Sequence, residues 1–274
     1  MEQVMNRPKV TVITVCYNAA ADIEVTLESV LGQTAYDDME VIVIDGGSTD
    51  GTVEKIRKYE MRLARFISEP DKGIYNAMNK GIALSTGEYV NFMNAGDRFF
   101  NSRVIADVLA EVEGMQSRPD VIYGATVFRF NDGYAGQRPN PAAMPGYMGA
   151  CHQSVFVDGD MIRRHLFDES YRISADFELL RRLYMQGAVF AEVNKYVSIY
   201  NFDGVSGSGA GRLRGVAERR RILGRPVSKF LCRMDVWRAT AGSLRRDLAD
   251  RLRSLVGMSV SRPAHRPLDE ISQL

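Results

Sequence analysis

Cysteine is scarce in this chain of 274 residues, and its few cysteines lie far apart. Cys16, Cys151 and Cys232 are the three present, and none belongs to a C-x-x-C pair. A disulfide framework or a structural zinc site needs several cysteines at short, regular spacings, so the sequence argues against both. Few, unpaired cysteines are typical of a protein in a reducing compartment.

Long apolar runs are also missing. No run approaches the roughly 18–20 residues that a membrane-spanning helix needs. The first stretch, MEQVMNRPKVTVITV, has neither the positive segment nor the long apolar segment of a secretory signal. We therefore expect a cytoplasmic protein that meets any membrane at its inner face.

A large net charge is absent, but the charges are unevenly distributed. The chain has 35 Lys and Arg and 34 Asp and Glu, a formal net charge of +1. Residues 1–210 hold 20 basic and 28 acidic side chains, whereas residues 211–274 hold 15 and 6. An acidic body joined to a basic tail indicates an anionic surface as a partner.

Strand-like and helix-like apolar patterns alternate along the body. We expect strands at Val10–Val15, Glu40–Ile44, Arg65–Ser68, Tyr89–Met93, Val121–Phe128, Ser154–Val157 and Val189–Tyr200. We expect helices at Ile23–Leu31, Thr52–Met61, Ile74–Leu84, Val104–Val112 and Ala175–Met185. This alternation predicts an α/β fold with a mostly parallel sheet and helices on both faces.

Two segments have the composition of loops. Asn131–Gly149 is rich in Gly, Pro, Asn and Met, which predicts loops or an irregular hairpin. Asn201–Gly211 reads NFDGVSGSGAG, a flexible composition, and we place a domain boundary there. The prediction is a catalytic or binding body over residues 1–210 and a tail over 211–274.

Polar residues follow four of the predicted strands. They are Tyr17-Asn18, Asp45, Glu69–Lys72 and Asn94–Asp97. The carboxyl ends of parallel strands share one edge of a sheet, where ligands bind in such folds, so these residues predict a site. The first turn, CYNAAAD, has no glycine, and no Walker A loop is present, which argues against dinucleotide or P-loop binding.

The carboxylates at the strand ends allow two interpretations, a role in ligand binding and a structural role. Asp45, before two glycines, is suited to accept a hydrogen bond from a nucleobase or ribose, or else to cap its own turn. Asp97, with Asn94 close by, offers the oxygen ligands that Mg²⁺ or Mn²⁺ prefers. A lone carboxylate at a strand end can also be purely structural.

Five segments in order carry a resemblance to a known family. They are VTVITVCYNAAADIEVTLESVLGQ, VIVIDGGSTDGT, ISEPDKGIYNAMNKGIALSTGEYVNFMNAGD, CHQSVFV and ISADFELLRRL. Together they resemble the inverting family 2 glycosyltransferases with the GT-A fold. They most resemble the branch that builds bacterial exopolysaccharide, capsule and O-antigen units, including colanic-acid-type transferases.

The resemblance implies a donor site for a nucleotide sugar, and we expect a UDP-sugar. Its nucleotide-sugar-binding residues would be Thr14, Tyr17, Asn18, Asp45, Asp71, Lys72 and Asn94. In that assignment Asp45 accepts a hydrogen bond from the base, and Asp71 and Lys72 complete the pocket. Asp45-Gly46 stands where many relatives have two acids, which leaves one acceptor in this turn.

The resemblance also implies the catalytic and metal residues of a hexosyltransferase-type enzyme. Asp97 matches the last aspartate of the D-x-D region, which holds the diphosphate through Mg²⁺ or Mn²⁺. The family often reads DSDD where this chain reads Asn94-Ala95-Gly96-Asp97, so one carboxylate remains. Asp176 matches the general base, although a carboxylate in the first turn of a helix also has a structural reading. His152 is an expected contact of the acceptor or diphosphate, or a structural histidine.

The tail predicts a cationic amphipathic helix. Its apolar residues recur every three or four positions: Phe230, Met234, Trp237, Ala241, Leu244, Leu248, Leu252 and Leu255. Basic residues are interleaved with them: Lys229, Arg233, Arg238, Arg245, Arg246, Arg251 and Arg253. Such a helix lies on anionic lipid, or packs its apolar stripe on the body or on a second subunit of a homo-oligomer.

The function that the resemblance implies is sugar transfer to a saccharide or polyprenyl-diphosphate-linked acceptor at the inner face of the membrane. The alternative is a catalytically silent nucleotide-sugar-binding or scaffold protein, because D-x-D carboxylates are missing. A nucleic-acid partner would need only clustered Lys and Arg. No recognised motif or basic–aromatic platform supports it, so we expect none.

Overall fold

The computed structural model describes residues 9–130, 133–140, 146, 149–201, 209–237 and 268. The chain divides into two compact units. The first comprises Met1–Val127 and Gln137–Asn201, and the second comprises Phe128–Gly136 and Phe202–Leu274. The boundary near residue 210 stays a prediction.

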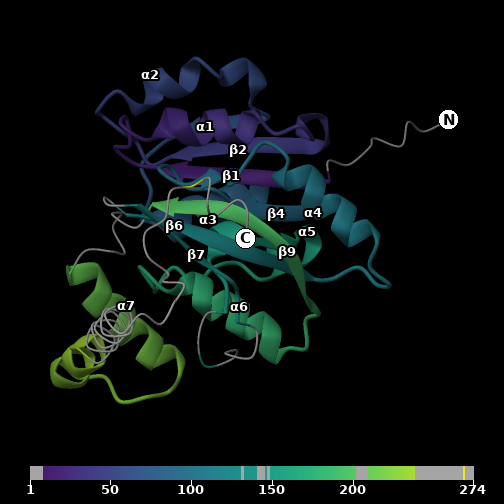
Figure 1. The fold of residues 1–274 in the computed structure, drawn as a ribbon. Helices are drawn as coiled ribbons and strands as arrows, with labels where there is room; N and C mark the ends of the chain where they lie inside the picture. The colour runs from purple at the N-terminus through teal and green to yellow at the C-terminus, as the bar shows by residue number, and fades with distance from the viewer. Residues whose placement is uncertain are drawn as a thin grey trace, which may run out of the picture. The chain divides into compact units, whose positions relative to one another are not determined.

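The first unit is an α/β structure around one sheet (Figure 1). Its strands are β1 (Val10–Cys16), β2 (Met39–Asp45), β3 (Arg65–Ser68), β4 (Tyr89–Phe92), β5 (Arg98–Phe99), β6 (Val121–Phe130), β8 (Val155–Asp158) and β9 (Phe190–Asn201). The last three residues of β6, Phe128–Phe130, belong to the second unit. Its helices are α1 (Ile23–Leu31), α2 (Thr52–Arg57), α3 (Ile74–Leu84), α4 (Val104–Glu113), α5 (Gly159–Arg164) and α6 (Ala175–Met185). The strand order is β3-β2-β1-β4-β8-β6-β9-β5, and β7 (Gly133–Gln137) pairs with β6.

The sheet has a parallel half and a half that contains antiparallel pairs. β3, β2, β1 and β4 are mutually parallel neighbours. β8 pairs antiparallel with both β4 and β6, and β5 pairs antiparallel with β9. The carboxyl ends of β1, β2, β3 and β4 therefore lie along one edge, as the sequence predicts.

Alternation along β1 places helices on both faces of the sheet. Val12 joins the buried apolar cluster that contains Leu27 of α1 and Val108 of α4. Ile13 points to the opposite face because successive side chains of a strand alternate. There a Cβ on Gly81 of α3 would lie 2.5 Å from Ile13 Cγ2, so α3 packs closely on β1. The predicted fold class is confirmed.

Several short elements differ from the sequence-based expectations. The helix expected over Thr52–Met61 ends at Arg57 and is followed by a 3₁₀ turn. β5 and α5 were not expected, because two and six residues are too few to show a period. The sequence signal for α5 is Asp158, whose carboxylate accepts a hydrogen bond from Met161 N at 2.8 Å.

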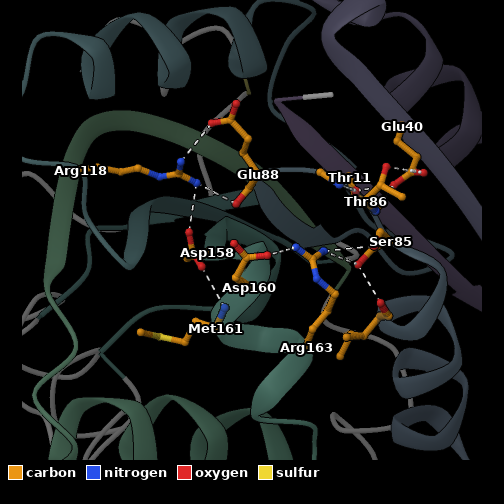
Figure 2. A network of polar contacts seen from close by, with 12 residues as sticks. Thr11, Glu40, Ser85, Thr86, Glu88, Arg118, Asp158, Asp160, Met161 and Arg163 are labelled. Carbon is orange, nitrogen blue, oxygen red and sulfur yellow. Dashed lines mark hydrogen bonds and ion pairs between the residues drawn. The ribbon is translucent and has the colours of Figure 1, made fainter. Parts of the chain in front are cut away.

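A polar network fastens the edge of the sheet opposite the carboxyl ends (Figure 2). Glu40 accepts hydrogen bonds from Thr11 Oγ1 at 2.6 Å and from Thr86 N at 2.7 Å. Arg118 forms ion pairs with Glu88 and Asp158 at 3.2 and 3.0 Å. These bonds join the amino ends of β1, β2 and β4 to the end of β8, so the scaffold is tied at one edge while the other carries the polar turns.

The second unit contains α7 (Gly209–Ile222), and residues 229–237 are also helical. Sequence composition predicted a loop through Gly211, but the helix begins at Gly209. Arg220 forms an ion pair with Asp235. Phe230 and Trp237 are 71% and 66% exposed and lie seven residues apart, hence on the same side of a helix. The predicted stripe beyond Trp237 lies outside the described residues, as does part of the predicted loop over Asn131–Gly149.

In the part of the chain that the structure describes, no helix combines the length and the apolar character needed to cross a bilayer.

Candidate active site

The turn after β2 is organised by the Asp45 carboxylate. Its two oxygens accept hydrogen bonds from Gly47 N, Ser48 N, Ser48 Oγ, Ser68 Oγ and Cys16 Sγ. Burial alone raises the pKa of this carboxyl, but the hydrogen bonds from Ser48 and Ser68 outweigh it, so the pKa of Asp45 lies below its ordinary value. Asp45 is fully buried and ties the ends of β1, β2 and β3 together.

The turn after β1 presents one aromatic ring. Tyr17 is 65% exposed although it directly follows a buried strand. Asn18 adopts a positive φ of 47°, its N–H donates to Ser48 Oγ, and its Oδ1 accepts from Thr49 N. Thr14 is fully buried inside the strand, so its side chain does not reach the surface of this site. The contact of Thr14 with the nucleoside stays a prediction, and its buried Oγ1 has no hydrogen-bond partner among the described residues.

The loop after β3 closes over the turn after β2. Asp71 Oδ1 accepts a hydrogen bond from Gly73 N at 2.7 Å. Asp71 Oδ2 would lie 2.5 Å from a Cβ placed on Gly46. Lys72 is held by its backbone, because its carbonyl accepts from the Arg172 guanidinium. The loop thus brings Asp71 and Lys72 to the sheet edge that holds Tyr17, and Arg172 is bound to the loop through the Lys72 carbonyl.

The turn after β4 buries Asp97. Asp97 Oδ2 accepts a hydrogen bond from Gln153 Nε2 at 2.7 Å, and Oδ1 accepts from Asn201 N at 2.9 Å. Burial raises the pKa of the Asp97 carboxyl to about 6, against the effect of both hydrogen bonds. Deprotonation of Asp97 therefore costs free energy unless a cation or a further hydrogen-bond donor contacts its carboxylate.

The oxygen atoms around Asp97 suit the coordination of a hard divalent cation. Asn94 Oδ1, Gln153 Oε1 and Asn201 Oδ1 are buried and have no hydrogen-bond partner among the described residues. Carboxylate and amide oxygens are the ligands that Mg²⁺ and Mn²⁺ take, and a cation would satisfy such oxygens. No group of three His, Cys, Asp or Glu side chains with metal-binding spacing occurs in the described ranges. Any cation here would thus depend on one carboxylate.

Asp176 lies at the start of α6 and is held on both oxygens. Oδ1 accepts from Phe177 N at 2.8 Å and from Tyr75 Oη of α3 at 3.3 Å. Oδ2 lies 3.1 Å from His152 Nδ1, and His152 Nε2 lies 3.1 Å from Asn94 Nδ2. With the Asn94 amide donating to Nε2, His152 is the tautomer that donates from Nδ1 to Asp176.

His152 thereby links the carboxylate on α6 to the turn after β4. Both of its ring nitrogens have partners within the protein, and its side chain is 19% exposed. Its expected contact with acceptor or diphosphate stays a prediction. What the structure shows is a contact of 3.1 Å between His152 Nδ1 and Asp176 Oδ2.

The fold brings most of the predicted residues to one edge and adds others. Tyr17, Asn18, Asp45, Asp71, Lys72, Asn94 and Asp97 come from the ends of β1 to β4, and His152 and Asp176 join Asn94. Tyr75, Gln153, Arg172 and Asn201 were missed. None lies at a predicted parallel strand end, and only the tertiary structure places them. CHQSVFV contains Gln153, but one glutamine carries no sequence signal of its own.

Comparison with known proteins decides the family. The sequence profile of glycosyl transferase family 2 matches residues 11–182, which include the carboxyl ends of β1 to β4 and Asp176. The chain belongs to glycosyl transferase family 2. The predicted family is confirmed, whereas its exopolysaccharide branch stays a prediction.

Relatives in this family are glycosyltransferases by name. A "PGL/p-HBAD biosynthesis glycosyltransferase" of Mycobacterium bovis is 29% identical over 213 residues, covering 74% of this chain and 80% of the relative. An "uncharacterized glycosyltransferase" of Mycobacterium tuberculosis is 31% identical over 180 residues, covering 64% of this chain and 68% of the relative. The chain is therefore of the glycosyltransferase type.

Solved structures share the fold at low identity. The mannosyltransferase PcManGT from Pyrobaculum calidifontis, in complex with GDP-Man and Mn²⁺, superposes with a TM-score of 0.60 at 21% identity. That match covers 94% of this chain and 77% of the neighbour. TarS of S. aureus, in complex with UDP-GlcNAc, has a TM-score of 0.60 at 17% identity, and the match covers 82% of this chain and 69% of the neighbour. The GT-A-type α/β fold predicted from the sequence is thus confirmed.

Proposed function

We propose that the protein is an inverting, metal-assisted glycosyltransferase that moves a hexose from a nucleotide-sugar donor to a saccharide or lipid-linked acceptor. The observation that carries this proposal is the Asp176 carboxylate. It is held by His152, Tyr75 and its own helix beside the turn that contains Asp97. A fixed carboxylate close to a diphosphate-binding turn is what deprotonation of an acceptor hydroxyl requires.

The donor would occupy the edge formed by the ends of β1 to β4. Neighbours with this fold bind UDP-GlcNAc and GDP-Man, which supports a nucleoside-diphosphate sugar here. Tyr17 and Asp71 would meet the nucleoside, and Lys72 and Arg172 would face the diphosphate with positive charge. Asn94 and Asp97 would hold the divalent cation with the diphosphate.

The reaction would be a single displacement. Asp176 takes the proton of the acceptor hydroxyl, the oxygen attacks the anomeric carbon, and the bond to the diphosphate breaks on the opposite face. His152 keeps the Asp176 carboxylate oriented, and Lys72 and Arg172 stabilise the negative charge on the leaving group. A divalent cation, when bound at Asp97, supplies further charge neutralisation on the diphosphate. One displacement converts an α-linked donor into a β-linked product.

A panel of nucleotide sugars tests donor binding. We expect UDP-sugars or GDP-sugars to raise the melting temperature, and Mn²⁺ to increase that rise, because a ligand that binds only the folded state stabilises it. Protection together with sugar transfer supports the enzyme. Protection without transfer or hydrolysis for any donor supports the alternative, a silent nucleotide-sugar-binding scaffold, which the missing carboxylates at Asn94 and Gly96 favour. Absence of protection by every donor contradicts both.

The acceptor side of the proposal includes a membrane. The second unit presents exposed Phe230 and Trp237 on one helical side, with Lys229 and Arg233 on the same helix. Aromatic and basic residues in this arrangement lie in the headgroup region of anionic lipids. We infer that the protein is peripheral to the inner face of the cytoplasmic membrane, where a polyprenyl-diphosphate-linked sugar of polysaccharide biosynthesis would be its acceptor.

Replacing both exposed aromatic residues of this helix tests the membrane contact. We expect Phe230→Ser with Trp237→Ser to lower affinity for phosphatidylglycerol vesicles about tenfold or more, because two apolar side chains lose their burial in lipid. Vesicle co-sedimentation measures it. Met61→Ser is the matched control, since Met61 is 99% exposed in the first unit. Equal binding by the double variant and the wild type contradicts the membrane contact.

A further inference from the structure

Gly46 occupies the position at which many relatives carry the second acid of the turn after β2. A Cβ at Gly46 would lie 2.5 Å from Asp71 Oδ2, 3.1 Å from Asp71 Cγ and 3.4 Å from Tyr17 Cδ2. Real Cβ atoms essentially never lie within 3.0 Å of another heavy atom. Any side chain at Gly46 would therefore displace the Asp71 carboxylate. The Asp71 carboxylate, from the loop after β3, thus occupies the space that a side chain at Gly46 would fill.

Asp45, the remaining acid of that turn, has no capacity for a ligand. Its two oxygens already accept five hydrogen bonds, from two backbone N–H groups, two serine hydroxyls and the Cys16 thiol. A carboxylate has about four lone-pair sites, so these partners saturate it. Asp45 is also fully buried. Its carboxylate is committed to holding the turn.

Asp71 has the free capacity that Asp45 lacks. Its Oδ1 is fixed by Gly73 N at 2.7 Å, which orients the carboxylate, while Oδ2 faces the backbone of Gly46. The Tyr17 ring borders the same spot and is 65% exposed. An oriented carboxylate beside an exposed aromatic face has the two features that nucleobase recognition needs: an acceptor and a stacking surface.

We propose that Asp71, and not Asp45, reads the nucleobase of the donor, with Tyr17 as its stacking partner. The proposal rests on the proposed function and names the base class that the site selects. A carboxylate accepts a hydrogen bond from the ring N–H of uracil or guanine. Cytosine and adenine present an unprotonated ring nitrogen there, which repels a carboxylate. The site therefore selects bases that carry a ring N–H donor.

Asp71→Asn tests the base selection, because the amide nitrogen of asparagine replaces a hydrogen-bond acceptor with a donor. We expect UDP affinity to fall roughly 10- to 100-fold, as when a hydrogen bond to a charged group is lost. We expect CDP affinity to rise at the same time, because the asparagine amide donates to N3 of cytosine. Isothermal titration with UDP and CDP at fixed Mn²⁺ measures the ratio. Glu113→Gln is the matched control, a carboxylate that pairs with Lys9 at 2.9 Å away from the carboxyl ends of the strands, and its ratio stays at the wild-type value.

A swap of the carboxylate position is the second arm. Gly46→Asp alone is expected to lose UDP binding, because the new side chain collides with Asp71. Gly46→Asp combined with Asp71→Gly is expected to recover UDP selection, since one carboxylate again occupies the shared space.

The outcomes separate the two proposals. An unchanged UDP-to-CDP ratio in Asp71→Asn, with tight UDP binding in the wild type, overturns the assignment of Asp71 and leaves the proposed function standing. A changed ratio in Asp45→Asn but not in Asp71→Asn overturns it in favour of Asp45. Failure of the wild type to bind any nucleoside diphosphate overturns both the assignment and the proposed function.

Discussion

Asp176→Asn is expected to lower the rate of sugar transfer by about 10²–10⁴-fold while donor affinity stays near the wild-type value. Asparagine keeps the size of the side chain, and its amide oxygen can still accept from Phe177 N, while its amide nitrogen would face His152 Nδ1, which then accepts in its other tautomer. It cannot take a proton from the acceptor hydroxyl. Parallel measurements of kcat and of donor dissociation constant separate loss of the base from loss of binding.

Glu178→Gln is the matched control for that variant. Glu178 lies two residues after Asp176 in α6. Its carboxylate forms an ion pair with Arg182 at 2.9 Å and does not contact the site. We expect its transfer rate to stay within a few-fold of wild type. Near-normal turnover by Asp176→Asn, or an equal loss in both variants, contradicts the assignment of the base.

Asp97→Ala is expected to abolish the effect of Mn²⁺ on donor binding and to reduce transfer by about 100-fold or more. Asp97 is the one carboxylate that remains in the Asn94–Asp97 turn, so its removal leaves neutral amide oxygens, which hold a divalent cation weakly. The measurement is the thermal protection by UDP-sugar with and without Mn²⁺. Protection in the variant is expected to be the same under both conditions.

The loss of two hydrogen bonds at Asp97 requires a structural control. Asp120→Ala removes a carboxylate that also accepts a backbone hydrogen bond, from Val189 N at 2.8 Å, away from the carboxyl ends of β1 to β4. We expect it to lower the melting temperature yet to preserve the Mn²⁺ effect. Persistence of that effect in Asp97→Ala would show that the cation is held elsewhere.

The parallel half of the sheet was predictable because its strands are buried and flanked by long helices. β3, α3 and α6 have the expected bounds, β1 and β4 differ by one residue at one end, and β2 differs by one residue at both ends. Once these strands are parallel, their polar ends must meet at one edge, so Tyr17, Asp45, Asp71 and Asp97 were available from periodicity alone. Their convergence needs no knowledge of any loop.

The remainder of the site depends on contacts between distant segments. Gln153 and Asn201 reach Asp97 across 56 and 104 positions of sequence, and Tyr75 reaches Asp176 across 101. No local pattern encodes such pairs, because strand pairing and helix packing set them. Local sequence does not encode the saturation of the Asp45 carboxylate either, since two of its hydrogen-bond donors, Ser68 and Cys16, come from other strands.

The basic tail was predictable in composition and less so in structure. α7 carries Arg219, Arg220 and Arg221 in its last turn but has no clear apolar face, whereas residues 229–237 present Phe230 and Trp237 to solvent. The interleaving of apolar and basic residues is thus realised only in the later helix, over the residues that the structure describes. The membrane proposal depends on that helix.

Transfer from an α-linked UDP-sugar or GDP-sugar to a saccharide acceptor tests the central claim most directly, with the product's anomeric configuration determined by NMR. The account predicts a β-linked product from the wild type and essentially no product from Asp176→Asn at the same protein concentration. An α-linked product would contradict the single displacement. A donor that binds tightly but is never transferred, with a range of saccharide and lipid-linked acceptors, would contradict the proposal that this protein is an enzyme.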